Sequence, residues 1–442
     1  MKAKLQTITW VSHNRNDLLK RSLHSCIDAL GNDHHNYRFI VAESGASQKR
    51  PDGIPSVNLM YLNDEYRFDF IRRMKRELLK RRIDPEVAEF SLGHDKSLGT
   101  EGVHRNLINL LTVGERFLTC DDDILFKIKK NDTGKEFHLF PSWSDLERVE
   151  EDCRTISLSD FLMVQDLYLD QATFASPGIR GHSIFGGPRF IFGLSDDVIL
   201  DSSQDLNFFG KALQSRLIWN ERTTAKLTQY APVATYTLAM NNAYDLAPCF
   251  PFGRNVDGAF VIATKAMSPQ SKTALGNMSI LHKPPEDRGA YSNLDEFDMR
   301  INDYLFMMWA HWMSLVPPHL SVKDRYEEAS NYFLKVGTMN LYEFQLYLKD
   351  VFHRTLRERK KQLEAQWLRL KDNSVIQVSD WSRLINDEIK LCQDLLLQEV
   401  ERLPSEASSF GEAREWIRNY GEMIKAWPVM RDIAKNFKTN WG

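Results

Sequence analysis

The sequence predicts an α/β protein with a mainly parallel central sheet, followed by an α-helical domain. Over the first 126 residues, short β-prone runs alternate with leucine-rich helical repeats, a pattern typical of parallel sheets. In one of these runs, FLTCDDDILFK at 117–127, three adjacent aspartates stand between two apolar segments. From about residue 290, apolar residues recur every three or four positions among many Lys, Arg and Glu residues. This last pattern predicts long amphipathic helices.

The first elements follow one another closely. Residues 5–12 are rich in Thr, Ile and Val and predict a strand. After the polar turn HNRN, a helix is expected whose apolar residues share one face: Leu19, Leu23, Ile27 and Leu30. Residues 38–45 and 57–62 predict the second and third strands.

A helix over 101–115 and a strand over 116–120 complete this half. Val103, Leu107, Leu110 and Leu111 lie on one side of the helix, and Gly114 is a suitable stop. In open α/β sheets, ligands bind outside the carboxyl ends of the strands. We therefore expect three polar groups along one edge of the sheet: Ser12-His13, Glu43-Ser44 and Asp121–Asp123.

The predicted organisation is a domain over 1–295, with halves 1–126 and 127–295, and a helical domain over 296–442. In the helical domain, the apolar run over 304–316 ends before Pro317-Pro318. Its 13 residues are fewer than the ~20 that a membrane span needs. A buried helix is therefore expected there, with contact at a membrane surface as the alternative.

Composition excludes several classes of protein. The 442 residues are 43% hydrophobic and 26% charged with a net charge of −3, so strong non-specific binding to nucleic acid is not expected. The five cysteines are scattered without CxxC spacing, which argues against a disulfide framework or a zinc site. The N-terminus MKAKLQTITW lacks the apolar segment of a secretory signal. We therefore expect a cytoplasmic protein.

Three adjacent carboxylates repel one another unless a cation lies nearby. In a strand, Asp121 and Asp123 face the same way because side chains alternate. Two such carboxylates can share a hard divalent cation, Mn²⁺ or Mg²⁺, which takes oxygen ligands and often binds substrate phosphates as well. The alternative is a solvated acidic turn. An EF-hand calcium loop is excluded, because the required Gly and distal Glu are missing.

The first 126 residues resemble the nucleotide-sugar-binding half of GT-A (Rossmann-like) glycosyltransferases, in particular the family-2-like group. The matching segments are TITWVSHNRNDLLKRSLHS, FIVAESGA and LGTEGVHRNLINLLTVGERFLTCDDD, in this order. The last of these is similar to the family's pattern of Gly, an Arg-Asn pair, an apolar helix, Gly-Glu, an apolar strand and a DxD motif. The resemblance implies a nucleotide-diphosphate-sugar donor, a metal at the DxD motif and transfer of the sugar to an acceptor.

The resemblance also implies roles for individual residues. The donor would be bound by Ser12, His13, Arg15, Glu43, Arg105, Asn106, Asp121 and Asp122. Glu43 stands where the family more usually has Asp. The metal would be held by Asp121, Asp123 and, late in the chain, His282.

Asp257 is the expected general base. PFGRNVDGAFVI at 251–262 resembles the family's late acidic motif, although Val256 stands where a second acidic residue often lies. An inverting transfer needs a base to take the proton of the acceptor, and Asp257 is the carboxylate left to act. The alternatives are an Asx turn or helix cap for Asp257, and a structural role for His282.

The segment IRRMKRELLKRR at 71–82 carries seven basic residues. Such a run is usually a solvated helix face, but contact with a membrane or another anionic surface stays open. Sequence-specific nucleic-acid binding is not expected. The helical domain leaves both acceptor binding and oligomerisation open, and the acceptor is unknown.

The sequence thus predicts a metal-dependent, inverting glycosyltransferase. The alternatives are a nucleotidyltransferase-like enzyme and a non-catalytic nucleotide- or partner-binding protein of the same fold. A nucleotidyltransferase would need a Gly-rich N-terminal loop to bind phosphates, but the loop WVSHNRND has no Gly. Against the second, the metal carboxylates are retained.

Overall fold

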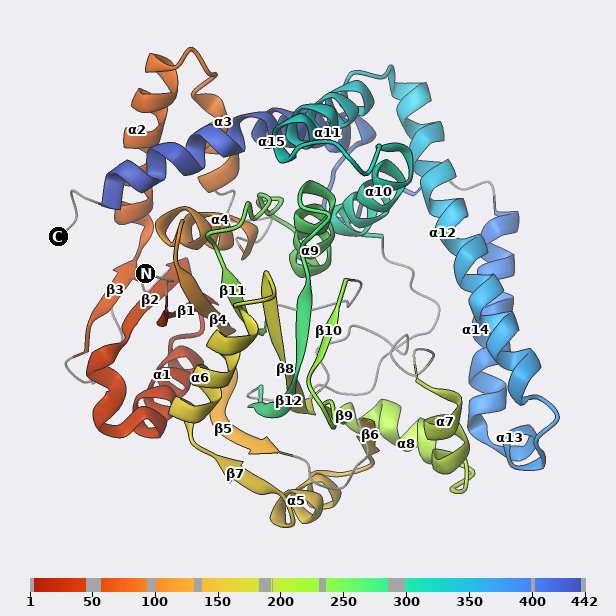
Figure 1. Ribbon diagram of the computed structural model, residues 1–442. Helices are drawn as coiled ribbons and strands as arrows, with labels where there is room; N and C mark the ends of the chain where they lie inside the picture. Colours follow the sequence, from red (N-terminus) through yellow and green to blue (C-terminus); the bar gives the residue numbers. More distant parts are fainter. Residues whose placement is uncertain are drawn as a thin grey trace.

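The computed structural model describes residues 4–44, 57–93, 101–130, 137–182, 192, 194–229, 236–284, 299–398 and 402–438. A large mixed sheet forms its centre, and helices cover this sheet (Figure 1). Four adjacent N-terminal strands run parallel, in the order β3 (Leu59–Leu62), β2 (Arg38–Ser44), β1 (Leu5–His13) and β4 (Arg116–Asp121). The predicted α/β class with its parallel N-terminal strands is therefore confirmed.

The remaining strands extend the sheet in mixed directions. Next to β4 lies the antiparallel strand β11 (Thr237–Asn241), followed by β8 (Phe174–His182), β12 (Thr273–His282), β5 (Ile124–Lys130) and β7 (Arg154–Ile156). β8 and β12 are parallel to each other. Short strands pair at the side: β6 (Phe137–Phe140), β9 (Leu217–Asn220) and β10 (Lys226–Thr228).

The helix after β1 forms as its apolar spacing predicts. All four residues of its predicted apolar face are buried in α1 (Asn16–Leu30). Burial of a leucine side chain contributes roughly 1.5–3 kcal/mol. A buried hydrogen bond of 2.9 Å from Trp10 Nε1 to Ser22 Oγ also ties α1 to β1. This packing fixes the turn between them, which follows His13 and carries Arg15.

Further helices accompany the strands. They are the 3₁₀ helix η1 (Gly31–Asn36), α2 (Asp64–Lys80), α3 (Glu86–Leu92), α4 (Glu101–Leu111), α5 (Trp143–Glu151), α6 (Leu158–Tyr168), α7 (Asp196–Ser202), α8 (Phe208–Ser215) and α9 (Val256–Met267). Gly114, just after α4, has a φ of 84°, so the expected stop lies in the left-handed region that favours glycine.

The C-terminal part is helical, as predicted. It contains α10 (Ile301–Leu315), α11 (Val322–Gly337), α12 (Leu341–Leu370), α13 (Ser374–Val378), α14 (Asp380–Leu397) and α15 (Phe410–Lys438). Helix α15 crosses over α2, α3 and α4, while α12 and α14 lie side by side (Figure 1). One hydrophobic cluster joins residues of the sheet with residues of these helices. The predicted boundary at 295 lies outside the described residues and stays a prediction.

The apolar run over 304–316 forms α10, whose Tyr304, Leu305, Met308 and Trp309 are completely buried. The helix ends at Leu315, just before Pro317, as expected for a segment that proline cannot continue. Among the described helices, none has both the length and the hydropathy for a membrane span.

Most of the basic residues of 71–82 pair with nearby carboxylates. The ion pairs are Arg72–Asp69, Arg73–Asp69, Lys75–Glu86, Lys75–Glu89, Lys80–Glu77 and Arg81–Asp432. Each exposed pair contributes little to stability, but together they neutralise much of the positive charge. The solvated helix face is therefore the interpretation that the contacts favour, and binding to an anionic surface stays a prediction.

Candidate active site

The carboxyl ends of the parallel strands bring the predicted polar groups to one edge of the sheet. Ser12 on β1 lies opposite Glu43 on β2, and Val11 lies opposite Asp121 on β4. Glu43 is 1% exposed, whereas His13 is exposed at the end of β1. The shared edge, which sequence alternation predicted, is thus present with all three groups.

Asp122 faces the loop that follows β1. Its Oδ2 accepts a hydrogen bond of 2.8 Å from Ser12 Oγ, and its Oδ1 lies 3.3 Å from Arg15 Nη1. Burial, and then the neighbouring charge of Asp123, raise the pKa of Asp122 to about 6, although Arg15 and Ser12 favour its ionised form. Asp122 therefore anchors the first loop, and its ionised form is costly in the absence of a ligand cation.

This cost gives a testable dependence of stability on pH. Because the pKa rises from 3.8 to about 6 on folding, the folded state binds the proton more tightly, and stability is lost as pH rises through this window. The full loss is on the order of 3 kcal/mol. Asp122→Asn keeps an acceptor for Ser12 and should raise the free energy of unfolding by about 1–3 kcal/mol at pH 8.

Urea denaturation in a chelating buffer at pH 8 and pH 3.5 checks this prediction. At pH 3.5 the carboxyl of Asp122 is protonated in the folded state, so the substitution should change stability little. An equal gain in the free energy of unfolding at both pH values would contradict a raised pKa of Asp122, because the effect of its charge must depend on pH.

Asp123 lies beside His282, at the end of β12. Asp123 Oδ1 is 3.2 Å from His282 Nε2, and both residues are nearly buried, at 3% and 2% exposure. The other ring nitrogen, Nδ1, lies 2.7 Å from the carbonyl oxygen of His182. A carbonyl oxygen can only accept, so Nδ1 carries a proton and Nε2 is the atom directed at the carboxylate.

The Asp123–His282 pair fits a divalent cation. Two ligand atoms bonded to one cation at about 2.1 Å and at right angles lie ~3 Å apart, close to the separation found here. A carboxylate and an imidazole held by a backbone carbonyl are also ligands that Mn²⁺ accepts. Among the described residues, however, no group of three or more His, Cys, Asp or Glu is gathered around one point.

Sequence reasoning missed the residues that hold this pair in place. Parallel pairing of β8 with β12 sets Gly181 opposite His282, which brings the His182 carbonyl to the imidazole. The backbone N–H of Lys283 donates to the carbonyl of Asp123 at 3.0 Å. Parallel pairing of distant strands leaves no local pattern in the sequence, so no signal could have identified His182.

Asp121 and Asp257 are joined by Arg105. Arg105 Nη2 lies 3.2 Å from Asp121 Oδ1 and 3.3 Å from Asp257 Oδ1. Desolvation, and then the charges of Asp257 and Asp123, raise the pKa of Asp121 to about 7 against the opposing charge of Arg105. Desolvation by itself would lower the pKa of Arg105, but Asp257 and Asp121 outweigh it and raise this pKa. The guanidinium is therefore the cation that compensates this acidic group.

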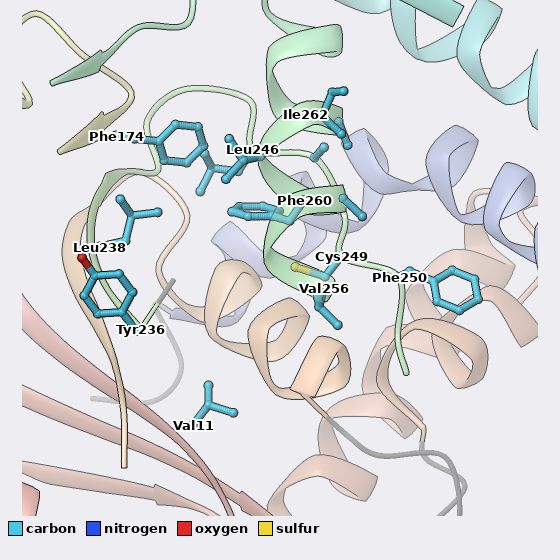
Figure 2. Packing of buried hydrophobic residues seen from close by; sticks show 14 of the residues in the cluster. Val11, Phe174, Tyr236, Leu238, Leu246, Cys249, Phe250, Val256, Phe260 and Ile262 are labelled. Atoms are coloured by element: carbon cyan, nitrogen blue, oxygen red, sulfur yellow. The ribbon is translucent and has the colours of Figure 1, made fainter. Parts of the chain in front are cut away.

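Asn106, predicted at the donor, makes buried contacts with the backbone. Its Nδ2 donates to the carbonyls of Cys249 at 2.8 Å and Ser91 at 3.1 Å, and its Oδ1 accepts from the N–H of Cys249 at 2.8 Å. These bonds tie α4 to the segment that leads into α9 and Asp257. Figure 2 shows Cys249 packed beside Val256 at the start of α9.

No family model matches the sequence, and no curated protein matches it. Among solved structures, the chain is similar to the mannosyltransferase PcManGT from Pyrobaculum calidifontis in complex with GDP-Man and Mn²⁺. The identity is 11% and the TM-score 0.33, over 89% of this chain and 86% of that chain. It is also similar to S. aureus TarS 1–349 in complex with UDP-GlcNAc, with 11% identity and a TM-score of 0.34, over 96% and 92% of the two chains. At this level of similarity, the residues of the site must carry the functional argument.

Proposed function

We propose that this chain is a metal-dependent glycosyltransferase that moves a sugar from a nucleotide-diphosphate sugar to an acceptor hydroxyl with inversion. One observation carries the proposal. The buried Asp123–His282 pair lies at the same sheet edge as Asp121, which Arg105 joins to Asp257. A site for a cation and a carboxylate that can serve as a base are thus neighbours.

The donor side is formed by the loop after β1 and the end of β2. Arg15 is about half exposed and carries a positive charge next to Asp122, so it can meet a diphosphate oxygen. Ser12 and Glu43 lie on adjacent strands at the same edge. We place the nucleotide over these strand ends, together with the exposed His13. This placement follows the rule that ligands lie outside the carboxyl ends of parallel strands.

The reaction is a single displacement. The acceptor oxygen forms a bond to the anomeric carbon while the bond from that carbon to the diphosphate oxygen breaks. Asp257 takes the proton of the acceptor hydroxyl, and the electron pair of the broken bond leaves with the nucleoside diphosphate. A divalent cation held by Asp123 and His282 would supply positive charge for the leaving group, and Asp121 would contact the donor beside it.

Asp257 is placed for this task by its helix. It lies in the first turn of α9, and its side chain is 26% exposed, so a substrate can reach it. The next residue, Gly258, lies close to the start of the helix: an added Cβ there would come within 3.1 Å of Asn255 Oδ1. A larger residue at 258 would therefore press on the turn that carries the proposed base.

Release of nucleoside diphosphate from a panel of nucleotide sugars tests the proposal. The wild-type protein with Mn²⁺ should turn over one donor by transfer to a trial acceptor or, more slowly, to water. Turnover should stop with a chelator and in Asp123→Ala. Release of pyrophosphate from a nucleoside triphosphate and a sugar phosphate would indicate a nucleotidyltransferase instead. Metal-dependent nucleotide binding without any turnover would indicate a binding protein.

A further inference from the structure

Arg105 contacts two carboxylates with one nitrogen. Its side chain is 6% exposed, and Nη2 lies 3.2 Å from Asp121 on β4 and 3.3 Å from Asp257 on α9. The proposed function gives these carboxylates different tasks, one at the donor and one at the acceptor. Without a cation between them, the two negative charges would repel each other. Arg105 is therefore placed to set their separation.

The backbone around Arg105 is locked to the segment that carries Asp257. A Cβ at Gly102 would come within 1.8 Å of the carbonyl oxygen of Phe250, so only glycine fits there. The N–H of Val103 donates to the carbonyl of Pro251 at 2.9 Å. Asn106 bonds to both backbone groups of Cys249. These contacts hold the first turns of α4 against residues 249–251, a few residues before Asp257.

We infer that Arg105 is a positioning residue that holds the base Asp257 in register with the donor carboxylate Asp121, and that the contacts of α4 with residues 249–251 keep it there. This inference rests on the proposed function. The rival role is direct contact with the donor, as predicted from the sequence. It has support as well, because Arg105 Nε and Nη1 make no hydrogen bond in the part of the chain that the structure describes. A positioning role makes kcat depend on Arg105, whereas direct contact with the donor makes the donor Kd depend on Arg105.

A double-mutant cycle separates the two roles. Arg105→Gln, Asp257→Asn and the double variant are compared with wild type by kcat for nucleoside diphosphate release and by donor Kd from calorimetry. We expect Arg105→Gln to lower kcat by ~10–100-fold, with donor Kd changed by less than ~3-fold. In the Asp257→Asn background, Arg105→Gln should lower kcat by less than ~3-fold, because the effect of Arg105 on kcat passes through Asp257. Arg105→Lys should restore part of kcat.

Two results would overturn the inference. One is a donor Kd weakened by ~10-fold or more at unchanged kcat, which makes Arg105 a donor ligand. The other is an equal loss of kcat in both backgrounds, which shows that the effect does not pass through Asp257. The same four proteins give a second cycle from urea denaturation without metal or donor. Coupling between Arg105 and Asp257 is expected there, and its absence would also overturn the inference, whether or not the protein is active.

Arg116 provides a matched control at the other end of β4. It is also 6% exposed and also bridges two aspartates, Asp166 at 2.9 Å and Asp170 at 2.7 Å. Arg116→Gln should lower stability but leave kcat of the folded protein unchanged. An equal fall of kcat in Arg116→Gln would show that loss of any such bridge slows the enzyme. Failure of the proposed function is a distinct result, since wild type would then release no nucleoside diphosphate from any donor.

Discussion

Asp257→Asn is expected to lower the rate of sugar transfer by ~10²–10⁴-fold while the nucleotide sugar still binds. Asparagine has nearly the same shape as aspartate, but it cannot accept the proton of the acceptor hydroxyl. Asp257 lies on α9, whereas the proposed donor contacts come from the ends of β1, β2 and β4. The loss should therefore fall on kcat, with the donor Kd changed little.

Steady-state kinetics and calorimetric titration of the donor measure the two quantities. Asp303→Asn is a suitable control, because Asp303 lies near the same helix end, 2.6 Å from Asn255 Nδ2, and has no proposed role in the reaction. Its transfer rate should stay within ~3-fold of wild type, as is usual for residues outside a reaction centre. Unchanged turnover in Asp257→Asn would remove Asp257 as the base.

Asp123→Asn and His282→Gln are expected to weaken binding of Mn²⁺ by at least ~10–100-fold. Loss of a residue that only orients a metal ligand already costs this much, and these two side chains would be ligands. Asp123 Oδ1 and His282 Nε2 lie 3.2 Å apart in a buried position, and the carbonyl of His182 fixes the imidazole. Electron paramagnetic resonance of free Mn²⁺ measures the affinity directly, without any need for donor or acceptor.

His311→Gln is the control for this series. His311 lies on α10 and contacts Tyr332 at 3.1 Å, so its replacement should leave Mn²⁺ affinity unchanged. If His282→Gln also bound Mn²⁺ as tightly as wild type, the imidazole would serve as a structural partner of Asp123, and only the aspartates would remain as ligands.

Local patterns in the sequence predicted much of the fold. The first strand and strand β4 form where β-prone and apolar runs indicate them, and helix α1 forms where leucine spacing does. The reason is physical, because burial of one face selects the period of apolar residues in α1, whereas β1 and β4 are buried on both faces and form from continuous apolar and β-branched runs. The edge that carries Asp121–Asp123 followed from the alternation of strands and helices alone.

Contacts between distant segments were not predictable in the same way. Arg105 was expected at the donor, yet its position between Asp121 and Asp257 depends on how α4 packs against residues 249–251. Asn106 looked like part of a binding motif, but it serves the backbone of Cys249. The parallel pairing of β8 with β12 likewise depends on the order of all strands in the sheet. Such pairings are set by tertiary packing, which single-sequence patterns do not encode.

Thermal unfolding with nucleotides tests the central claim most directly. Wild type and Asp123→Ala would be unfolded with a panel of nucleoside diphosphates and their sugars, with and without Mn²⁺. A ligand at ~100 times its Kd stabilises the folded state by about 2.7 kcal/mol, which gives a clear rise in Tm. The account predicts a rise with one nucleotide that requires Mn²⁺ and disappears in Asp123→Ala. No rise with any nucleotide would contradict it and leave Asp121–Asp123 as an acidic turn without a ligand.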